Sequence, residues 1–575
     1  MILKSMQQRF NSDDYYQVLS MLLLFAVVIL LVGIGWRSPW PADEPRFAEV
    51  AREMVDSGQW FFPQRGGEFY PDKPPVFMWA IALFYGLTGS LKVAFLLPNA
   101  LAGLLTLFLV YDLGSRLWNV RVGRNAALLL MLAPQFLIQS KNAQIDAMVM
   151  CWITLGCYGL LRHFMTGPNW RWYFAGWAFM GLGVITKGVG FLPLLMLIPI
   201  IAYALIQKDL FKGRLQWWCL AGPLAMLAVI ACWLVPMVLI VQGQGTPELL
   251  QYQNNILFKQ TGERYVNAWH HIKPWYYFLV SVVPVMWFPL PLLFIAHWQR
   301  FVAKVKADPV IAILLIWVVL VLVFFSISPG KRGVYILPAL PMLALALSAI
   351  ITGADTKRWF EWGLTALLWI LGLVFTTAGV LALIHHPAIV KAMADYAADL
   401  THIGYLLLTV GIIWFVILVA LRHSQAMVRM GISLAMTWMV IGTWGYTILE
   451  PMRTPQVLMA NVAEAIGPDG QLGLVKFKEQ FILFSPVDIT HFSYLAPLEQ
   501  QERNAWQWMH EGDERYILVG DHQKLSCFDF SGAKSMGVAH RDNWVLLSKD
   551  NMLPTCAEPD RRYQYFTPTP GRWME

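Results

Sequence analysis

The chain has 575 residues, of which 57% are hydrophobic and only 14% are charged, and its mean hydropathy is +0.51. Because a soluble globular protein has about a quarter of charged residues, the composition excludes that class. The net charge of +7 does not indicate nucleic-acid binding, since Lys and Arg fall mostly in short connectors between apolar runs.

The first apolar run, residues 18–36, is long enough to cross about 30 Å of hydrocarbon as a helix. No small-residue cleavage site follows it, so we expect an anchor and not a removed signal peptide. The shorter run 75–89 opens with a proline and predicts an interfacial or re-entrant helix. The thirteen expected spans are 18–36, 91–113, 124–140, 146–165, 171–187, 189–207, 217–241, 275–297, 309–327, 333–352, 360–384, 403–421 and 428–449.

The connectors differ in charge on the two sides of the membrane. Seven connectors on the side of the N-terminus carry Lys and Arg, whereas opposite connectors such as "SKNAQID" and "TKG" carry one base each. Since basic residues favour the cytoplasm, this bias predicts a cytoplasmic N-terminus. An odd number of spans then places the C-terminal tail outside.

The tail, residues 450–575, has the composition of a small α/β domain. "PQVLMANVAEAI" and "QQERNAWQWMHEG" predict helices, while "QLGLVKF", "RYILVG" and "NWVLLSK" predict strands. Outside the cytosol, Cys527 and Cys556 could form a disulfide that closes a loop of about 30 residues and contributes about 3 kcal/mol. The expected fold is therefore an all-α polytopic membrane domain, residues 1–449, followed by an α/β domain, residues 450–575.

This topology gathers ionisable side chains on the outer face, where they indicate a site for an anionic, membrane-borne substrate. They are Asp43, Glu44, Asp72 and Lys73 in the first loop (37–90), Lys141 and Asp146 in the second, Lys259, Glu263, Arg264, His270, His271 and Lys273 in the loop 242–274, and Lys331, Arg332 and Tyr335 in the last.

Each of these residues also has a structural interpretation. Asp43 could cap an amphipathic helix whose apolar face is Phe47, Val50, Ala51 and Met54. The remaining structural interpretations are an N-cap at Asp146, snorkelling of Lys73, an interfacial pair of histidines at 270–271, and lipid headgroup binding by Arg264, Lys331 and Arg332. The location of all of them on one side favours a functional site.

Three stretches resemble a known family: "DEPRFAEVAREM", "GEFYPDKPPVFMWAIALFYGLTG" and "SPGKRGVYILPALP". They are similar to GT-C fold glycosyltransferases that use polyprenyl-phosphate sugars, in particular the bacterial aminoarabinose lipid A transferases and the dolichyl-phosphate-mannose-protein mannosyltransferase-like family. The resemblance covers residues 15 to 350, and the layout of spans and tail agrees with it more loosely.

The resemblance implies roles for individual residues. Asp43 and Asp146 match the family's catalytic acidic positions. Lys73, Arg264 and Lys331 would bind the donor phosphate, and Glu44, Arg332 and Tyr335 would line the substrate cavity. Aminoarabinose transferases usually have Glu before the first-loop lysine, linked with a histidine at a metal site. Here Asp72 and His271 hold those places, so a zinc-like divalent metal is the one cofactor to consider.

The implied enzyme moves a sugar, for example aminoarabinose, from undecaprenyl phosphate to an outer-leaflet glycolipid such as lipid A. It would act as a monomer among the lipids of the bacterial inner membrane, with a periplasmic C-terminal domain. Cations would stabilise the departing phosphate. Asp43 would be the base for a hydroxyl acceptor, or would orient an acceptor that is already an anion.

Two further functions stay open. A transferase of the same fold could move a hexose to a protein hydroxyl or to another envelope glycan. A transporter or flippase of lipid-linked sugars is the candidate from another class, but such proteins often have repeated halves and broken helices at mid-membrane depth. The sequence has no internal repeat, and its charges cluster in outer loops. A structural anchor for the tail would need only one span.

Overall fold

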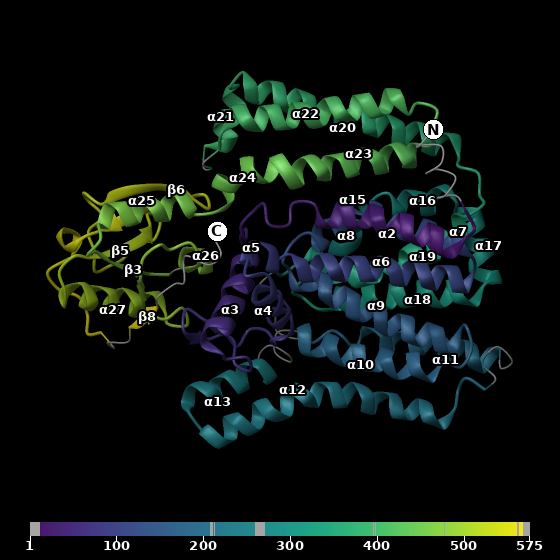
Figure 1. Ribbon diagram of the computed structural model, residues 1–575, viewed down its shortest axis with the longest axis horizontal. Coiled ribbons are helices and arrows are strands. Elements are labelled where there is room, and N and C mark those ends of the chain that lie inside the picture. The colour runs from purple at the N-terminus through teal and green to yellow at the C-terminus, as the bar shows by residue number, and fades with distance from the viewer. Residues whose placement is uncertain are drawn as a thin grey trace.

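The computed structural model describes residues 12–207, 211, 213–258, 271–394, 396, 398–476, 478–559 and 563–566. Helices form a large bundle, and the strands of the C-terminal domain lie at one end of it (Figure 1). Within the described ranges, eight helices are long and apolar enough to cross a membrane. The number is nine if the pair Phe278–Met286 and Leu290–Ala296, bent by 95°, is one span. The protein is a multi-pass membrane protein.

All thirteen predicted spans fall on helical segments, but the number thirteen exceeds the eight or nine helices of full length. α2 (Tyr15–Leu31) has only 17 residues. The span predicted at 124–140 is two helices, α7 (Val120–Leu132) and α8 (Pro134–Ser140). Pro134 interrupts the segment, since proline has no N–H to donate to the preceding turn, and Ala133 before it is extended.

The remaining helices of the bundle follow in chain order. They are α5 (Leu91–Ala94), α6 (Leu97–Leu117), α9 (Ile145–Phe164), α10 (Trp170–Lys187), η1 (Leu192–Met196), α11 (Leu197–Ile206), η3 (Trp217–Ala221), α12 (Gly222–Gln244), α13 (Pro247–Asn254), η5 (Phe278–Val282), α15 (Val283–Met286), α16 (Leu290–Ala296), α17 (Trp298–Ala307), α18 (Pro309–Ile327), η6 (Gly333–Ala339), α19 (Leu340–Ile351), α20 (Arg358–Leu383), α21 (Pro387–Met393), α22 (Leu400–Ala420), α23 (Ala426–Val440), η7 (Ile441–Gly445) and α24 (Tyr446–Arg453).

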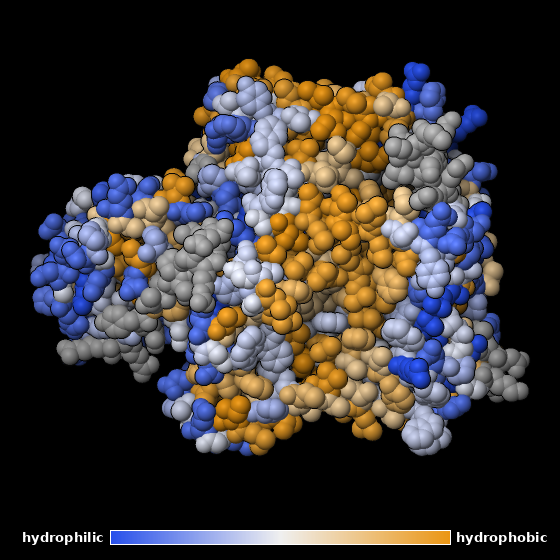
Figure 2. Space-filling view, viewed as in Figure 1, coloured by the Kyte–Doolittle hydropathy of each residue, from blue (hydrophilic) through white to orange (hydrophobic). Residues whose placement is uncertain are grey.

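The bundle has a protein-buried centre and a lipid-facing periphery. α9 buries nearly all of its residues, whereas α12 buries only four, Gly222, Trp233, Met237 and Val241. Figure 2 shows the result as a broad apolar band over the helices, with hydrophilic surface on the C-terminal domain and at the opposite end. Apolar side chains facing outward in such a band are expected where the solvent is lipid.

The first loop carries its own small structures. α3 (Glu44–Ser57) is the predicted amphipathic helix, and its residues Phe47, Val50, Ala51 and Met54 are buried as the spacing requires. A short hairpin follows, formed by β1 (Gln64–Arg65) and β2 (Glu68–Phe69). The run expected to be interfacial or re-entrant forms α4 (Val76–Thr88), which packs against α3.

The C-terminal domain is a six-stranded sheet with helices, in agreement with the predicted α/β composition. The strand order is β6-β7-β5-β3-β4-β8, with β3 parallel to β4 and β5 and the other pairs antiparallel. The predicted helices are confirmed as α25 and α27, and the predicted strands as β3, β5 and β7. The elements are α25 (Gln456–Ile466), β3 (Gln471–Leu474), α26 (Glu479–Leu483), β4 (Ile489–His491), α27 (Leu498–His510), β5 (Arg515–Gly520), β6 (Lys534–Ala539), β7 (Asp542–Leu547), η8 (Lys549–Asn551) and β8 (Gln564–Phe566).

A disulfide joins Cys527 to Cys556 in this domain, with their Cα atoms 5.3 Å apart. We expect neither thiol to react with maleimide in the native, unreduced protein, because both are oxidised. The same two cysteines, labelled after reduction, serve as the reactive control. Reduction should lower the stability of the domain by about 3 kcal/mol, because the freed loop gains entropy when unfolded. Maleimide labelling of both cysteines before reduction would contradict the prediction.

Candidate active site

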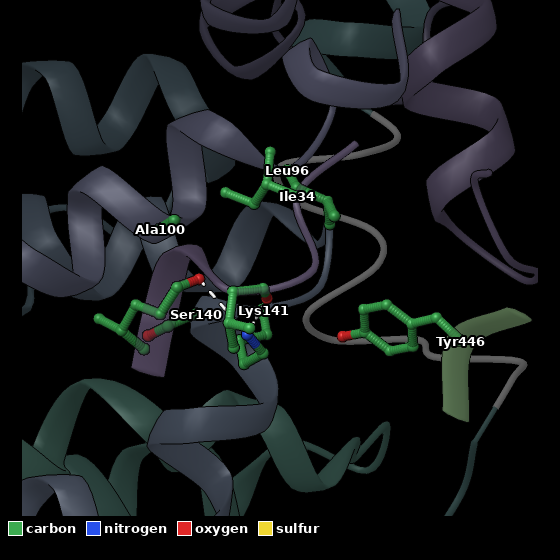
Figure 3. Close-up of a pocket in the computed structure, with 8 residues that line it drawn as sticks. Ile34, Leu96, Ala100, Ser140, Lys141 and Tyr446 are labelled. Atoms are coloured by element: carbon green, nitrogen blue, oxygen red, sulfur yellow. Dashed lines mark hydrogen bonds between the residues drawn. The ribbon is translucent and has the colours of Figure 1, made fainter. Parts of the chain in front are cut away.

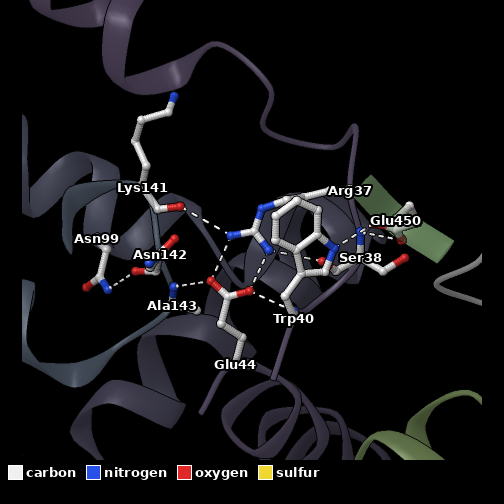
Figure 4. A network of polar contacts seen from close by, with 9 residues as sticks. All are labelled: Arg37, Ser38, Trp40, Glu44, Asn99, Lys141, Asn142, Ala143 and Glu450. Atoms are coloured by element: carbon white, nitrogen blue, oxygen red, sulfur yellow. Dashed lines mark hydrogen bonds and ion pairs between the residues drawn. The ribbon is translucent and has the colours of Figure 1, made fainter. Parts of the chain in front are cut away.

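The loop that leads from α2 into α3 is held by a buried ion pair. The Nη2 atom of Arg37 donates to Oε1 of Glu44 at 2.7 Å, and Nη1 donates to the other carboxylate oxygen. Glu44 also accepts from the backbone N–H groups of Trp40 at 2.7 Å and Ala143 at 2.9 Å. Figure 4 shows these contacts, with Glu450 of α24 bonded to the same loop.

This network changes the interpretation of Glu44. The sequence predicted that Glu44 lines the substrate cavity, but its side chain is buried and both of its oxygens are bonded within the protein. Glu44 therefore stabilises the loop that carries Asp43. Because each of its oxygens already accepts two hydrogen bonds from the protein, this carboxylate has no free acceptor site for a substrate.

Lys141, another predicted outer charge, has a structural role too. Its Nζ donates to the carbonyl oxygens of Ile29 at 2.8 Å and Val32 at 2.7 Å, at the C-terminal end of α2. A cation there is favourable, because the last carbonyls of a helix have no partner within it. Figure 3 shows Lys141 beside Ile34, Leu96 and Ala100 in a small hollow without room for water.

The side chain of Asp43 contacts residues from separate parts of the bundle. Its Oδ2 accepts from Arg332 Nη2 at 3.0 Å and from Gln144 Nε2 at 3.2 Å. Its Oδ1 lies 3.8 Å from Arg46 Nη1, and in the described part of the chain no hydrogen bond reaches that oxygen. Although Asp43 precedes α3, its side chain makes no capping hydrogen bond, so the interpretation as a simple helix cap is wrong.

The charges around Asp43 keep it ionised. Its side chain is only 16% exposed. Burial alone would raise its pKa, but Arg332, Arg46 and Lys187 together bring the pKa below its ordinary value. Asp43 is therefore a carboxylate at neutral pH, with one anchored oxygen and one oxygen available to a substrate.

Asp146 lies in the first turn of α9, next to the same group of charges. Gln144, and not Asp146, occupies the N-cap position, without a capping hydrogen bond from its side chain, and the Asp146 carboxylate forms an ion pair with Lys187. Lys187 is the last residue of α10, and its Nζ lies 4.9 Å from the centre of the Tyr335 ring. The structure thus brings together four of the predicted residues, Asp43, Asp146, Arg332 and Tyr335.

The sequence alone does not single out Lys187, because it stands there only as a charge in a short connector. We expect Lys187→Met to lower turnover about ten- to a hundredfold, because Asp146 would lose its cation and Asp43 would lose one of the positive charges that keep it ionised. Lys187→Arg should retain part of the activity because the charge is kept. Turnover of both purified variants checks this, and wild-type turnover by Lys187→Met would contradict it.

Of the three predicted phosphate ligands, Lys331 and Lys73 lie in the described part of the chain. Lys331 is buried, and its Nζ donates to the carbonyl oxygens of Ser328 at 2.5 Å and Lys273 at 3.0 Å. It therefore fastens the segment 271–273 to the loop before η6. Lys73 lies half-buried in the turn between β2 and α4. Arg264 lies outside the described residues, as do Lys259, Glu263 and His270.

The metal site that the resemblance implied, at Asp72 and His271, stays a prediction. No group of three or more His, Cys, Asp or Glu side chains able to hold a metal occurs in the ranges that the structure covers. His271 is exposed, and its carbonyl oxygen accepts from the Lys331 amide at 3.0 Å. Asp72 is half-buried in the turn before α4. We therefore derive no step through a metal.

The C-terminal domain docks beside the first loop. Glu479 of α26 accepts from Arg46 Nε at 2.7 Å and also from Arg65. His491 Nε2 lies 2.6 Å from the carbonyl oxygen of Gly66, and the Tyr494 hydroxyl donates to the carbonyl oxygen of Phe69 at 2.5 Å. The side chain of Arg46 therefore lies between the C-terminal domain and Asp43.

Comparisons with known proteins agree with this fold. The family model of the dolichyl-phosphate-mannose-protein mannosyltransferases matches residues 72–235. The crystal structure of ArnT from Cupriavidus metallidurans bound to undecaprenyl phosphate superposes with a TM-score of 0.68 at 19% identity, covering 93% of this chain and 99% of that one. The protein is an integral membrane glycosyltransferase of the GT-C type.

Sequence relatives define the family within that class. An undecaprenyl phosphate-α-4-amino-4-deoxy-L-arabinose arabinosyl transferase of Pseudomonas fluorescens Pf-5 is 31% identical over 401 residues, 68% of this chain and 69% of the relative. That of Pseudomonas savastanoi pv. phaseolicola is 32% identical over 57% of this chain, and the alignment spans 60% of the relative. The chain belongs to the family of these arabinosyl transferases.

Proposed function

We propose that the protein transfers 4-amino-4-deoxy-L-arabinose from undecaprenyl phosphate to a phosphate group of lipid A. The observation that carries this proposal is the ionised Asp43, anchored through one oxygen by Arg332 and Gln144 beside the Asp146–Lys187 pair. The donor is inferred from the names of the relatives.

The chemistry requires a positively charged wall for phosphates and a carboxylate near the sugar. In the proposed reaction the bond between the sugar C1 and the donor phosphate oxygen breaks, and its electrons stay on undecaprenyl phosphate. A phosphate oxygen of lipid A forms the new bond to C1. Arg332 and Lys187 would stabilise the phosphate charge. Since the acceptor is already an anion, Asp43 removes no proton and stabilises positive charge that develops on the sugar ring.

A cavity near the first loop supports a lipid-linked donor. It has a volume of about 440 Å³ and lies between residues 58–69 of the first loop and the end of α12 with α13. Trp60, Phe61, Phe62 and Phe69 supply much of its lining. Such an aromatic cavity would suit part of an isoprenoid chain, and its size is typical of ligand sites.

The proposed location is the bacterial inner membrane, with the site and the C-terminal domain facing the periplasm. The charge bias of the connectors supports this orientation. The disulfide between Cys527 and Cys556 supports it independently, because disulfides persist in oxidising compartments and are rare in the cytosol.

Mass spectrometry of lipid A from cells with and without the protein tests the proposal. We expect an added mass of one aminoarabinose on a lipid A phosphate when the wild type is present, and no added mass with Asp43→Asn. The lipid A acceptor would be contradicted if lipid A stays unmodified in cells with the protein while sugar-charged carrier accumulates in cells without it. That result would favour the acceptor suggested by the mannosyltransferase family model, a protein or glycan hydroxyl. An unchanged carrier pool would favour a transporter.

A further inference from the structure

The C-terminal domain contributes one buried carboxylate to the surroundings of the site. Glu479 is the first residue of α26, which packs on α3, and its side chain is only 4% exposed. One of its oxygens, Oε1, accepts from both Arg46 and Arg65. Burial alone would raise the pKa of Glu479, but these two arginines lower it, so Glu479 is ionised.

Arg46 lies between this carboxylate and that of Asp43. Its Nε is bound to Glu479 at 2.7 Å, whereas its Nη1 stops 3.8 Å from Asp43 Oδ1, beyond hydrogen-bonding distance. The charges alternate in sign along a chain of five residues: Arg332, Asp43, Arg46, Glu479 and Arg65. The last acid in this chain belongs to the C-terminal domain.

We propose that Glu479 is a positioning residue that holds Arg46 away from Oδ1 of Asp43, so that this oxygen stays available to the substrate. Bonds between a guanidinium and a carboxylate are strong, and an arginine without its partner turns to the nearest acid. Without the Glu479 charge, Arg46 would close the 3.8 Å gap and occupy Oδ1. The inference rests on the proposed role of Asp43 in glycosyl transfer.

The experiment compares variants of the purified, full-length protein with labelled donor. We expect Glu479→Gln to lower kcat about tenfold or more and to leave the donor KM unchanged, because the substrate still binds but the carboxylate is occupied. Adding Arg46→Met to Glu479→Gln should raise kcat above that of Glu479→Gln, because the blocking guanidinium is gone while Arg332 and Lys187 still lower the pKa of Asp43. Glu479→Asp should retain more activity than Glu479→Gln.

A matched control separates positioning from simple docking of the domain. Tyr494→Phe removes the hydrogen bond to Phe69 at the same interface and leaves the chain of charges intact. It should keep the wild-type kcat. Wild-type kcat in Glu479→Gln would overturn the proposal. So would a double variant no more active than Glu479→Gln, since that result would mean that Glu479 only docks the domain.

A measurement without substrate keeps the inference separate from the proposed function. Carbodiimide coupling of a small amine to Asp43, followed by peptide mass spectrometry, reports access to its carboxylate. Labelling should be slower in Glu479→Gln than in wild type and should recover in the double variant. If wild type modifies no lipid A, the proposed function fails, and these labelling rates still support or overturn the role of Glu479.

Discussion

Replacing Asp43 by Asn should lower the rate of sugar transfer at least about a hundredfold while the protein still folds and inserts into the membrane. Asn has the shape of Asp, so Gln144 and Arg332 can keep contacts with its side-chain oxygen. The negative charge is lost, and with it the stabilisation of positive charge on the sugar. Turnover of the purified variant with labelled donor is the measurement.

The matched control is Asp399→Asn, the same chemical change in an exposed acid that caps α22. Asn is also a good cap, so this variant should turn over as wild type does. Equal activity of Asp43→Asn and wild type would remove Asp43 from the mechanism. A loss of folded protein in Asp43→Asn would instead assign it a structural role.

The second large effect concerns Glu44, the neighbour of Asp43. Glu44→Ala should lower the free energy of unfolding by about 3–5 kcal/mol, because Arg37 would be left as a buried charge without its carboxylate. Thermal unfolding in detergent or nanodiscs measures the change. The exposed pair of Asp13 and Arg121 provides the control, and Asp13→Ala should leave the unfolding temperature unchanged.

The two neighbouring acids therefore give opposite expectations. Asp43→Asn should lose activity and keep stability, whereas Glu44→Ala should lose stability first. If Glu44→Ala unfolded at the wild-type temperature and lost only activity, Glu44 would line the substrate cavity, as its position in the sequence suggested.

Much of the fold could be predicted because lipid imposes simple requirements on a chain. The apolar runs of the spans, the amphipathic α3 and the apolar runs of β5 and β7, whose last four residues are buried, follow from burial of apolar surface. The number of complete spans could not, because composition does not show where Pro134 divides a run into α7 and α8. The strands β4, β6 and β8 are short or half-exposed and lack a clear apolar pattern.

The candidate site was predicted only in part, for a similar reason. A sequence shows which charges gather in the connectors of one side, and three of them, Asp43, Asp146 and Arg332, lie near one another in the structure. It does not show which charges are neutralised by the protein itself. Glu44 is paired with Arg37, Lys331 is bonded to backbone carbonyls, and Lys187 at the end of α10 pairs with Asp146 at the start of the neighbouring α9. Only three-dimensional contacts separate these cases.

The spacing of the ion pairs along the chain has a consequence for biosynthesis. Arg37 and Glu44 are seven residues apart, so the first loop can form its buried pair soon after it leaves the ribosome. Arg332, the partner of Asp43, is synthesised 289 residues after it. Glu479, the partner of Arg46, is synthesised 433 residues after Arg46. A chain truncated before its last domain would thus carry the pair of Arg37 and Glu44, but it would lack Glu450, which bonds to the same loop, and Glu479, which binds Arg46. Nascent enzyme would remain inactive until its synthesis is almost complete.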